Sequence, residues 1–240
     1  MGKSEPQYRR ILLKISGEVL SGEQEGAISP DILEYIVREV KKIHEKGIQV
    51  ALVVGGGNII RGVNSERMGL DRISADFMGM LGTIVNSIAL KSVFNKHGIK
   101  AEIFSAIPVG AIVSPHDAHR AQNTLKKGTV VIFAGGTGNP YFSTDSSAAL
   151  RAIEINADVL LKGTKVDGVY TADPSKDRTA KKLDELTFDE MVLKNLRVMD
   201  MTAATLCRDN GMKVIVFNLL EPDSLLKIIS GEKIGTLIRG

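Results

Sequence analysis

The sequence predicts an α/β protein of three layers, in which helices cover both faces of a mainly parallel, doubly wound sheet. Two observations support this fold class. Short apolar runs alternate with longer amphipathic segments along the whole chain of 240 residues, which is typical of repeated β-α-β units. One run, residues 48–54, is almost unbroken in its apolar character, as expected of a strand that is covered on both faces.

The first predicted unit begins with a strand at residues 10–15. A helix follows, for which Ser29 is the expected N-cap and Pro30 the first helical residue. Apolar residues recur at helical spacing until Gly47, which ends the helix. The strand at residues 48–54 then completes a β-α-β unit.

The same alternation continues to the end of the chain. The next helix is expected at residues 76–95, with Met78, Leu81, Ile84, Val85 and Ile88 on one side. Thr187 and Glu190 form the capping-box signature of a short helix. The remaining expected elements are strands at 101–104, 129–134, 158–162 and 213–217, helices at 116–126, 145–156 and 222–230, and an edge strand at 236–239.

Composition narrows the classes of function. The 31 basic and 28 acidic residues give a net charge of only +3, without the basic excess of a dedicated nucleic-acid binder. Partners are therefore expected among small molecules, with no nucleic acid. The single cysteine, Cys207, suits a reducing compartment. No signal peptide or membrane span is recognised, so we expect a cytoplasmic protein with no membrane partner.

The chain shows no internal repeat, low-complexity stretch or obvious linker. We therefore expect residues 1–240 to form a single domain. The alternative is a looser division into an N-terminal half that binds an acceptor and a C-terminal half that binds a nucleotide.

Four loops that directly follow predicted strands concentrate the glycine and polar residues. Ligands of open α/β sheets bind outside the carboxyl ends of the strands. The first loop places Lys14 beside Ser16 and Gly17, so a point charge and backbone N–H groups could surround a phosphate. The alternative is a solvated lysine before a turn.

The second loop contains Gly55, Gly56 and Gly57, with Arg61 shortly after them. Glycines let the backbone approach a ligand closely and direct N–H groups at anionic oxygens. Arg61 would add a bidentate donor for phosphate. Phosphate binding is favoured over a purely structural turn, because the glycines lie between a buried strand and an arginine.

The third loop, residues 135–145, brings glycines, hydroxyls, an amide and a carboxylate together. Asp145 stands where the N-cap of the following helix is expected. The alternative role for Asp145 is catalytic, since a carboxylate between two lysines can hold both in place.

The fourth loop starts from Lys162 at a strand end and includes the turn pair Asp167 and Gly168. Tyr170 could flank a purine ring, although each of these residues, taken singly, is more typical of a surface turn than of a site. The P-loop motif is absent from the sequence, and the histidines form no metal-spaced set with Cys or Glu. No metal site is predicted.

The four loops in this order resemble the amino acid kinase family, and more closely its bacterial UMP kinase branch. The resemblance extends from about Arg9 to Leu237, with mild departures at Ser143 and Gly163, where Thr and Ala are common. The TGNP and DxMGM segments are specific to the UMP branch, whereas the glycine-rich and Lys-Ser-Gly segments are shared with carbamate, acetylglutamate and aspartate kinases. The matching strings are ILLKISGE (11–18), GGGN (55–58) with Arg61 and Gly62, DFMGML (76–81), GTGNPYFSTD (136–145) and TKVDGVYTADP (164–174).

This resemblance implies a phosphotransferase of pyrimidine nucleotide biosynthesis, which moves the γ-phosphoryl group of ATP in line onto UMP. Mg²⁺ would arrive with ATP rather than at a dedicated protein site. Lys14 and Lys162 would neutralise the transferring group, and Asp145 would keep both lysines in place. The implied ATP-binding residues are Lys14, Ile15, Ser16, Gly17, Gly57, Arg61, Thr164, Tyr170 and Asp173.

The same resemblance implies a separate set of residues for UMP. Asp76 is suited to accept hydrogen bonds from ribose hydroxyls, and the loop after Gly136 could bind the uracil edge. The implied UMP-binding residues are Gly56, Asp76, Thr137, Gly138, Asn139, Pro140, Tyr141, Phe142, Ser143 and Thr144.

The family also implies a homohexamer that is activated by GTP and inhibited by UTP. Its GTP-linked loop would correspond to Gly22, Glu23, Gln24, Glu25, Gly26 and Ala27.

Three alternatives to a UMP kinase are open. A kinase of the same fold that acts on carbamate or an acyl carboxylate would share the ATP half, although Asp76 and residues 137–144 speak against it. A nucleotide-binding protein without turnover is disfavoured by intact Lys14, Lys162 and Asp145. A nucleic-acid regulator is disfavoured by the low net charge.

Overall fold

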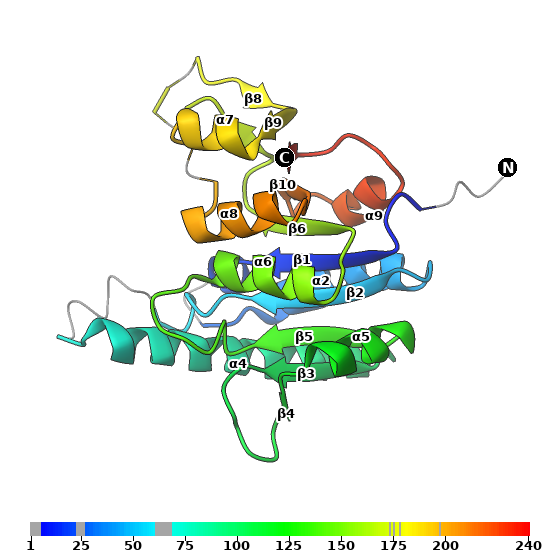
Figure 1. Cartoon of the computed structure of the whole chain (residues 1–240). Coiled ribbons are helices and arrows are strands. Elements are labelled where there is room, and N and C mark those ends of the chain that lie inside the picture. The colour runs from blue at the N-terminus through cyan, green and yellow to red at the C-terminus, as the bar shows by residue number, and fades with distance from the viewer. Residues whose placement is uncertain are drawn as a thin grey trace, which may run out of the picture.

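The computed structural model describes residues 6–22, 27–60, 69–172, 174, 176–177, 179–196 and 198–240. Within these residues, nine strands form one continuous sheet (Figure 1). They are β1 (Arg10–Ile15), β2 (Gln49–Val54), β3 (Ala101–Ser105), β4 (Ser114–Pro115), β5 (Val130–Ala134), β6 (Val159–Thr164), β9 (Glu185–Thr187), β10 (Val214–Asn218) and β11 (Thr236–Arg239). Their order across the sheet is β4-β3-β5-β2-β1-β6-β10-β11-β9.

Neighbouring strands from β4 to β10 all run parallel, which confirms the predicted mainly parallel sheet. The last two strands differ, since β11 is antiparallel to β10 and parallel to β9. The prediction that residues 236–239 form an edge strand is wrong, because β9 covers β11 and is itself the edge. A separate antiparallel pair is formed by β7 (Val169–Tyr170) and β8 (Lys182–Leu183).

Helices cover both faces of the sheet, as predicted (Figure 1). Successive residues of a strand point to opposite faces. In β1, Leu13 therefore joins one core cluster and Leu12 the other. The first cluster includes residues of α1 (Gly17–Leu20), α2 (Pro30–His44), α4 (Arg72–Lys96) and α9 (Ser224–Ile229). The second includes residues of α5 (Ala118–Lys126), α6 (Thr144–Glu154), α7 (Phe188–Leu193) and α8 (Met201–Asp209).

The long helix α4 differs from its prediction in extent and in orientation. It begins at Arg72, because the side chain of Asp71 accepts a hydrogen bond from the Ser74 N–H at 3.0 Å and caps the helix. On the predicted apolar side, Leu81, Val85 and Ile88 are exposed and only Ile84 is among the buried residues. The buried side carries the apolar residues Met80, Ile84, Leu90 and Phe94, together with polar Thr83, Asn86 and Ser87.

The apolar character of α4 on both sides has a second consequence. By length and composition alone, α4 could cross a membrane, with a hydropathy of 1.4 over its most apolar stretch. However, 44% of that stretch is buried inside the protein, and core helices of soluble proteins pass the same test. This helix is therefore weak support for a membrane span.

Candidate active site

Lys14 and Lys162 lie side by side near the carboxyl ends of two neighbouring strands. The register of the parallel strands β1 and β6 pairs these two residues directly, so both side chains point to the same face of the sheet. Both are largely buried, with side chains 10% and 12% exposed. The chain continues from β1 toward one edge of the sheet and from β6 toward the other. Such a switch point is where open α/β sheets bind ligands.

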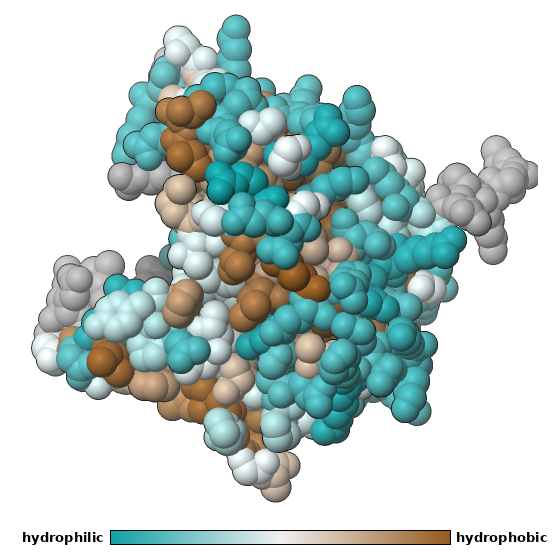
Figure 2. Space-filling model, viewed as in Figure 1, coloured by the Kyte–Doolittle hydropathy of each residue, from teal (hydrophilic) through white to brown (hydrophobic). Residues whose placement is uncertain are grey.

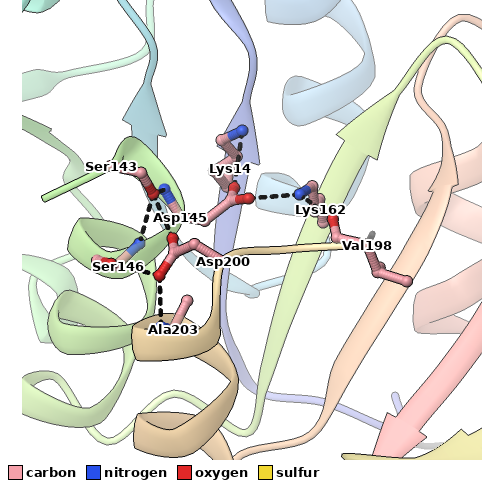
Figure 3. A network of polar contacts seen from close by, with 8 residues as sticks. All are labelled: Lys14, Ser143, Asp145, Ser146, Lys162, Val198, Asp200 and Ala203. Carbon is pink, nitrogen blue, oxygen red and sulfur yellow. Dashed lines mark hydrogen bonds and ion pairs between the residues drawn. The ribbon is translucent and has the colours of Figure 1, made fainter. Parts of the chain in front are cut away.

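Asp145 lies between the two lysines (Figure 3). Its Oδ1 is 2.9 Å from Nζ of Lys14, and its Oδ2 accepts a hydrogen bond from Nζ of Lys162 at 2.5 Å. The prediction that Asp145 is a helix N-cap is wrong. Ser143 caps α6 instead, and its Oγ accepts hydrogen bonds from the N–H groups of Asp145 and Ser146. The carboxylate of Asp145 is thereby left for the lysines, in the alternative arrangement considered from the sequence.

The electrostatics of this trio keep Asp145 ionised. Burial raises the pKa of Asp145, but the two lysines lower it by more, so it lies below its ordinary value of 3.8. Burial lowers the pKa of Lys162; Asp145 raises it and Lys14 lowers it further, and the net result lies below 10.5. One carboxylate thus offsets part of two positive charges, and the cluster remains a site for an anion.

Asp200 extends the network and was not identified from the sequence. It caps α8 by accepting a hydrogen bond from the Ala203 N–H at 2.9 Å. It also accepts hydrogen bonds from the hydroxyls of Ser143 and Ser146, at 2.9 Å for Ser146 (Figure 3). The nearby carbonyl of Val198 accepts a hydrogen bond from Lys162. The sequence signal for this helix start was available, because an Asp directly before a helix-forming segment is a common N-cap.

A cavity of about 690 Å³ adjoins Lys162 at the end of β6. Thr164 and Tyr170, both predicted to bind ATP, line it. The Tyr170 hydroxyl donates a hydrogen bond to Asp167 Oδ1 at 2.8 Å. Two other predicted ATP ligands, Arg61 and Asp173, lie outside the described residues. The remaining lining residues, none of which was among the predicted ATP-binding residues, are Lys162, Val166, Gly168, Val169, Thr171, Ala172, Pro174, Lys176, Lys194, Asn195, Leu196, Val198 and Val216.

A second cavity, of about 530 Å³, lies at the ends of β2 and β5. It is lined by the predicted UMP residues Gly56, Asp76, Phe142, Ser143 and Thr144. Gly57, which was predicted to bind ATP, also lines this cavity. Its other lining residues are Ile60, Leu70, Arg72, Ala75, Gly79, Met80, Thr83 and Gly136. Absent from its lining are the predicted Thr137, Gly138, Asn139, Pro140 and Tyr141.

The order of the sheet places the two lysines between the two cavities. Across the sheet the order is β5-β2-β1-β6. The second cavity lies at the ends of β5 and β2, Lys14 and Lys162 belong to β1 and β6, and the first cavity adjoins β6. The loops after β1 and β2 touch, because a Cβ on Gly17 would lie only 2.6 Å from the Gly57 nitrogen. Only glycine fits there. The arrangement suits two anionic ligands that meet at a pair of cations.

Residues 9–218 match the sequence model of the amino acid kinase family. The chain belongs to the amino acid kinase family. This confirms the resemblance seen in the sequence and makes the protein a phosphotransferase. A curated relative, the uridylate kinase of Marinobacter nauticus, is 50% identical over 236 residues, which cover 98% of each chain.

Solved structures in this family share the fold. The UMP kinase of Bacillus anthracis is 40% identical, with a TM-score of 0.95 over 97% of this chain and 96% of that one. The UMP kinase of Ureaplasma parvum is 36% identical, with a TM-score of 0.92 over 98% of this chain and 100% of that one. The uridylate kinase of Archaeoglobus fulgidus is 31% identical, with a TM-score of 0.72 over 95% of this chain and 99% of that one.

In this amino acid kinase, Asp76 connects α4 to the third loop. Its Oδ2 accepts hydrogen bonds from Arg72 Nε at 2.8 Å and from the Tyr141 N–H at 2.7 Å. The guanidinium of Arg72 also lies over the Tyr141 ring, 5.4 Å from its centroid. Tyr141 is thus hydrogen-bonded to Asp76, which lines the second cavity, but Tyr141 does not line that cavity itself.

The predicted effector segment is only partly described. Gly22 has a positive φ of 66°, and the carbonyl of Ala27 accepts a hydrogen bond from the Asn58 side chain. Glu23, Gln24, Glu25 and Gly26 lie outside the described residues.

Among the residues that the structure describes, no group of three or more His, Cys, Asp or Glu side chains is placed to hold a metal ion. Asp145 and Asp200 are each engaged by protein donors.

Proposed function

We propose that this phosphotransferase moves the γ-phosphoryl group of Mg-ATP onto the phosphate of UMP, giving UDP and ADP. The observation that carries the proposal is the pair of cavities on either side of Lys14, Asp145 and Lys162. The second cavity contains Asp76 and residues of the segment characteristic of the UMP branch. Relatives that are named uridylate or UMP kinases support the choice of acceptor.

The proposed reaction is a single in-line displacement. An oxygen of the UMP phosphate attacks the γ-phosphorus, and the bond from that phosphorus to the β–γ bridging oxygen breaks, so ADP leaves. Phosphate monoesters have a second pKa of about 6, so the attacking oxygen is already ionised at neutral pH and needs no strong base. Catalysis then consists of positioning and of charge neutralisation by Lys14 and Lys162. Asp145 holds the two lysines in place.

The positions of the cavities along the chain support a division of labour. Every residue that lines the second cavity precedes Asp145, and every residue that lines the first lies at Lys162 or beyond. We assign the second cavity to UMP and the first to ATP. This agrees with an acceptor half followed by a nucleotide half within residues 1–240.

The remaining assignments follow from the family resemblance. Mg²⁺ would enter with ATP as part of the substrate. Activation by GTP, inhibition by UTP and a cytoplasmic location are expectations of the same kind.

For the proposed homohexamer there is a supporting observation on α4. Five large apolar side chains along one side of this helix are 40–49% exposed, which is unusual for an isolated subunit. They are Ile73, Phe77, Leu81, Val85 and Ile88, and we call them the α4 stripe. In the space-filling view, hydrophobic residues lie at the surface at the lower left, where Figure 1 places α4 (Figure 2).

The function is tested by ADP release from Mg-ATP with UMP, CMP, AMP, carbamate and aspartate as separate acceptors, each with and without GTP and UTP. Turnover with UMP alone is expected. Turnover with carbamate or aspartate instead would assign the chain to another kinase of the family. Binding of ATP without turnover on any acceptor would contradict the proposed reaction.

A further inference from the structure

The buried side of α4 carries polar residues to which the proposed reaction assigns no role, although one of them, Thr83, lines the second cavity. Thr83 is 5% exposed, and Asn86 and Ser87 are fully buried. Polar side chains are rarely buried in the middle of a helix unless they have hydrogen-bond partners. The partners of Thr83 and Asn86 are the two glycine loops that border the second cavity.

Asn86 holds the glycine loop that follows β2. Its Nδ2 donates hydrogen bonds to the Gly55 carbonyl and to Asn58 Oδ1, each at 2.7 Å. Its Oδ1 accepts one from Asn58 Nδ2 at 3.0 Å. A Cβ on Gly17 would lie 2.6 Å from Asn58 Oδ1, so Asn58 in turn packs against the loop after β1. Asn86 thereby connects α4 to the loop beside Lys14.

Thr83 holds the glycine loop that follows β5. Its Oγ1 accepts a hydrogen bond from the Gly135 N–H at 2.8 Å and donates one to the Met80 carbonyl at 2.6 Å. Gly135 and Gly136 both have positive φ values, of 73° and 60°. This is a backbone conformation that few other residues adopt. The Thr83 hydroxyl therefore helps to orient a loop that has little conformational preference of its own, together with Arg151, which donates a hydrogen bond to the Gly136 carbonyl at 3.3 Å.

The distance between the two loops is set on one turn of α4. β2 and β5 are adjacent strands, so their loops face each other across the second cavity. The loop after β2 also touches α4 directly, since a Cβ on Gly56 would lie 2.2 Å from the Gly79 carbonyl oxygen. The hydrogen bonds of Thr83 and Asn86 therefore tie both loops to the same helix.

We propose that Thr83 and Asn86 are positioning residues for phosphoryl transfer. Thr83 sets the loop that faces the acceptor, and Asn86 sets the loop shared between the acceptor and the lysine pair. Neither side chain needs to touch the reacting atoms. The inference rests on the proposed function only in naming UMP as the acceptor.

Thr83→Val tests the first half of this proposal. The substitution keeps the shape of the side chain and leaves the Gly135 N–H unpaired. The loop is then no longer held in the conformation that would receive UMP, which should weaken UMP binding by about tenfold. We expect a KM and a calorimetric Kd for UMP raised by about tenfold, with the KM for ATP unchanged. Thr83→Ser keeps the hydroxyl and should restore the UMP affinity.

Ser87→Ala is the matched control. Ser87 is also buried on the same helix, but its Oγ donates to the Thr83 carbonyl at 2.7 Å, and among the described residues it has no hydrogen bond to either loop. Its removal should leave both KM values unchanged. Asn86→Leu should lower kcat by about tenfold, because the loop beside Lys14 loses its support.

Hydrogen exchange of the Gly135 amide provides a readout that needs no acceptor. Exchange should be faster in ligand-free Thr83→Val than in the wild type, and unchanged in Ser87→Ala. If wild-type protein forms no UDP, the proposed function fails, while the exchange result still decides whether Thr83 holds the loop. An unchanged UMP KM in folded Thr83→Val, or equal changes in Thr83→Val and Ser87→Ala, would overturn the proposal.

Discussion

At the scale of single residues, the register of β1 and β6 brings two positive charges together. Lys14 and Lys162 are direct register partners on neighbouring strands. Two positive charges held so close together repel each other unless an anion lies between them. Asp145 supplies that anion, at 2.9 Å and 2.5 Å from the two ammonium nitrogens. The protonation states of Lys162 and Asp145 therefore determine whether the site can neutralise a transferring phosphoryl group.

The pH profile of kcat/KM for UMP should reflect these groups. Lys162 must be charged, and its pKa lies below the ordinary 10.5 because burial lowers it. Activity should therefore fall as the pH rises through a value below 10.5. Asp145 raises the pKa of Lys162, so Asp145→Asn should move this alkaline midpoint to lower pH. A midpoint that is unchanged in the Asn variant would contradict the assignment.

The acid side of the same profile should not report Asp145. Its pKa is below 3.8, so it stays ionised through the range in which the UMP phosphate gains a proton, at about pH 6. We expect an acid midpoint near that of the acceptor phosphate.

Asp200 should affect both stability and turnover. Asp200→Ala removes the N-cap of α8, which should cost about 0.5–2 kcal/mol in the free energy of unfolding. It also releases the Ser143 and Ser146 hydroxyls beside Asp145, so kcat should fall as well. Asp117 is a matched control, because it caps α5 in the same way, accepting from the Arg120 N–H at 2.9 Å.

Asp117→Ala should lower the stability by a similar amount and leave kcat unchanged, as measured by urea unfolding and initial rates. Equal kcat values for the two alanine variants would show that Asp200 has only a capping role.

The sequence identified those site residues whose surroundings are local. Lys14 and Lys162 were singled out because each lies at the end of an apolar strand, just before a glycine-containing loop, and their catalytic role was implied by the family resemblance. For Asp145 the local pattern left N-capping and lysine binding both open, because its partners come from strands whose pairing no local pattern reveals; the role between the lysines came from the family resemblance. Thr83 was overlooked for the same reason, since Gly135 lies 52 residues away in the chain.

At the scale of elements, α4 shows why an apolar pattern alone does not orient a helix. It carries large apolar residues on both sides, and the side chosen from the sequence is the exposed one. The buried side includes small and polar residues, Gly82, Thr83 and Asn86, which face the glycine loops. Hydrogen bonds to the glycine loops compensate for burying those polar groups.

The α4 stripe should form a subunit interface. Leu81→Lys places a charge in the middle of this stripe and should lower the molar mass measured by light scattering, because an unpaired charge is costly in an apolar interface. Leu193→Lys on α7 is the control, since Leu193 is exposed to 84% but lies outside the stripe. A molar mass that both variants share with the wild type would exclude the stripe as an interface.

At the scale of the whole molecule, the alternation of strands and helices was sufficient to predict the layers and the parallel sheet. The order of the strands was not predicted, because pairing between distant segments leaves no periodic signal. The edge was also misplaced, since β9 has only three residues, Glu185–Thr187, and no apolar run of its own. The strand order is nevertheless what places the lysine pair between the two cavities.

The most direct test of the proposed function is the rate of UDP formation from saturating Mg-ATP and UMP in the wild type and in Lys14→Ala. The wild type should form UDP. Lys14→Ala should fold normally and form UDP about 10²–10³ times more slowly, as expected when one charge-stabilising donor is removed. Near-normal UDP formation by Lys14→Ala, or no UDP from the wild type, would contradict phosphoryl transfer to UMP at this lysine pair.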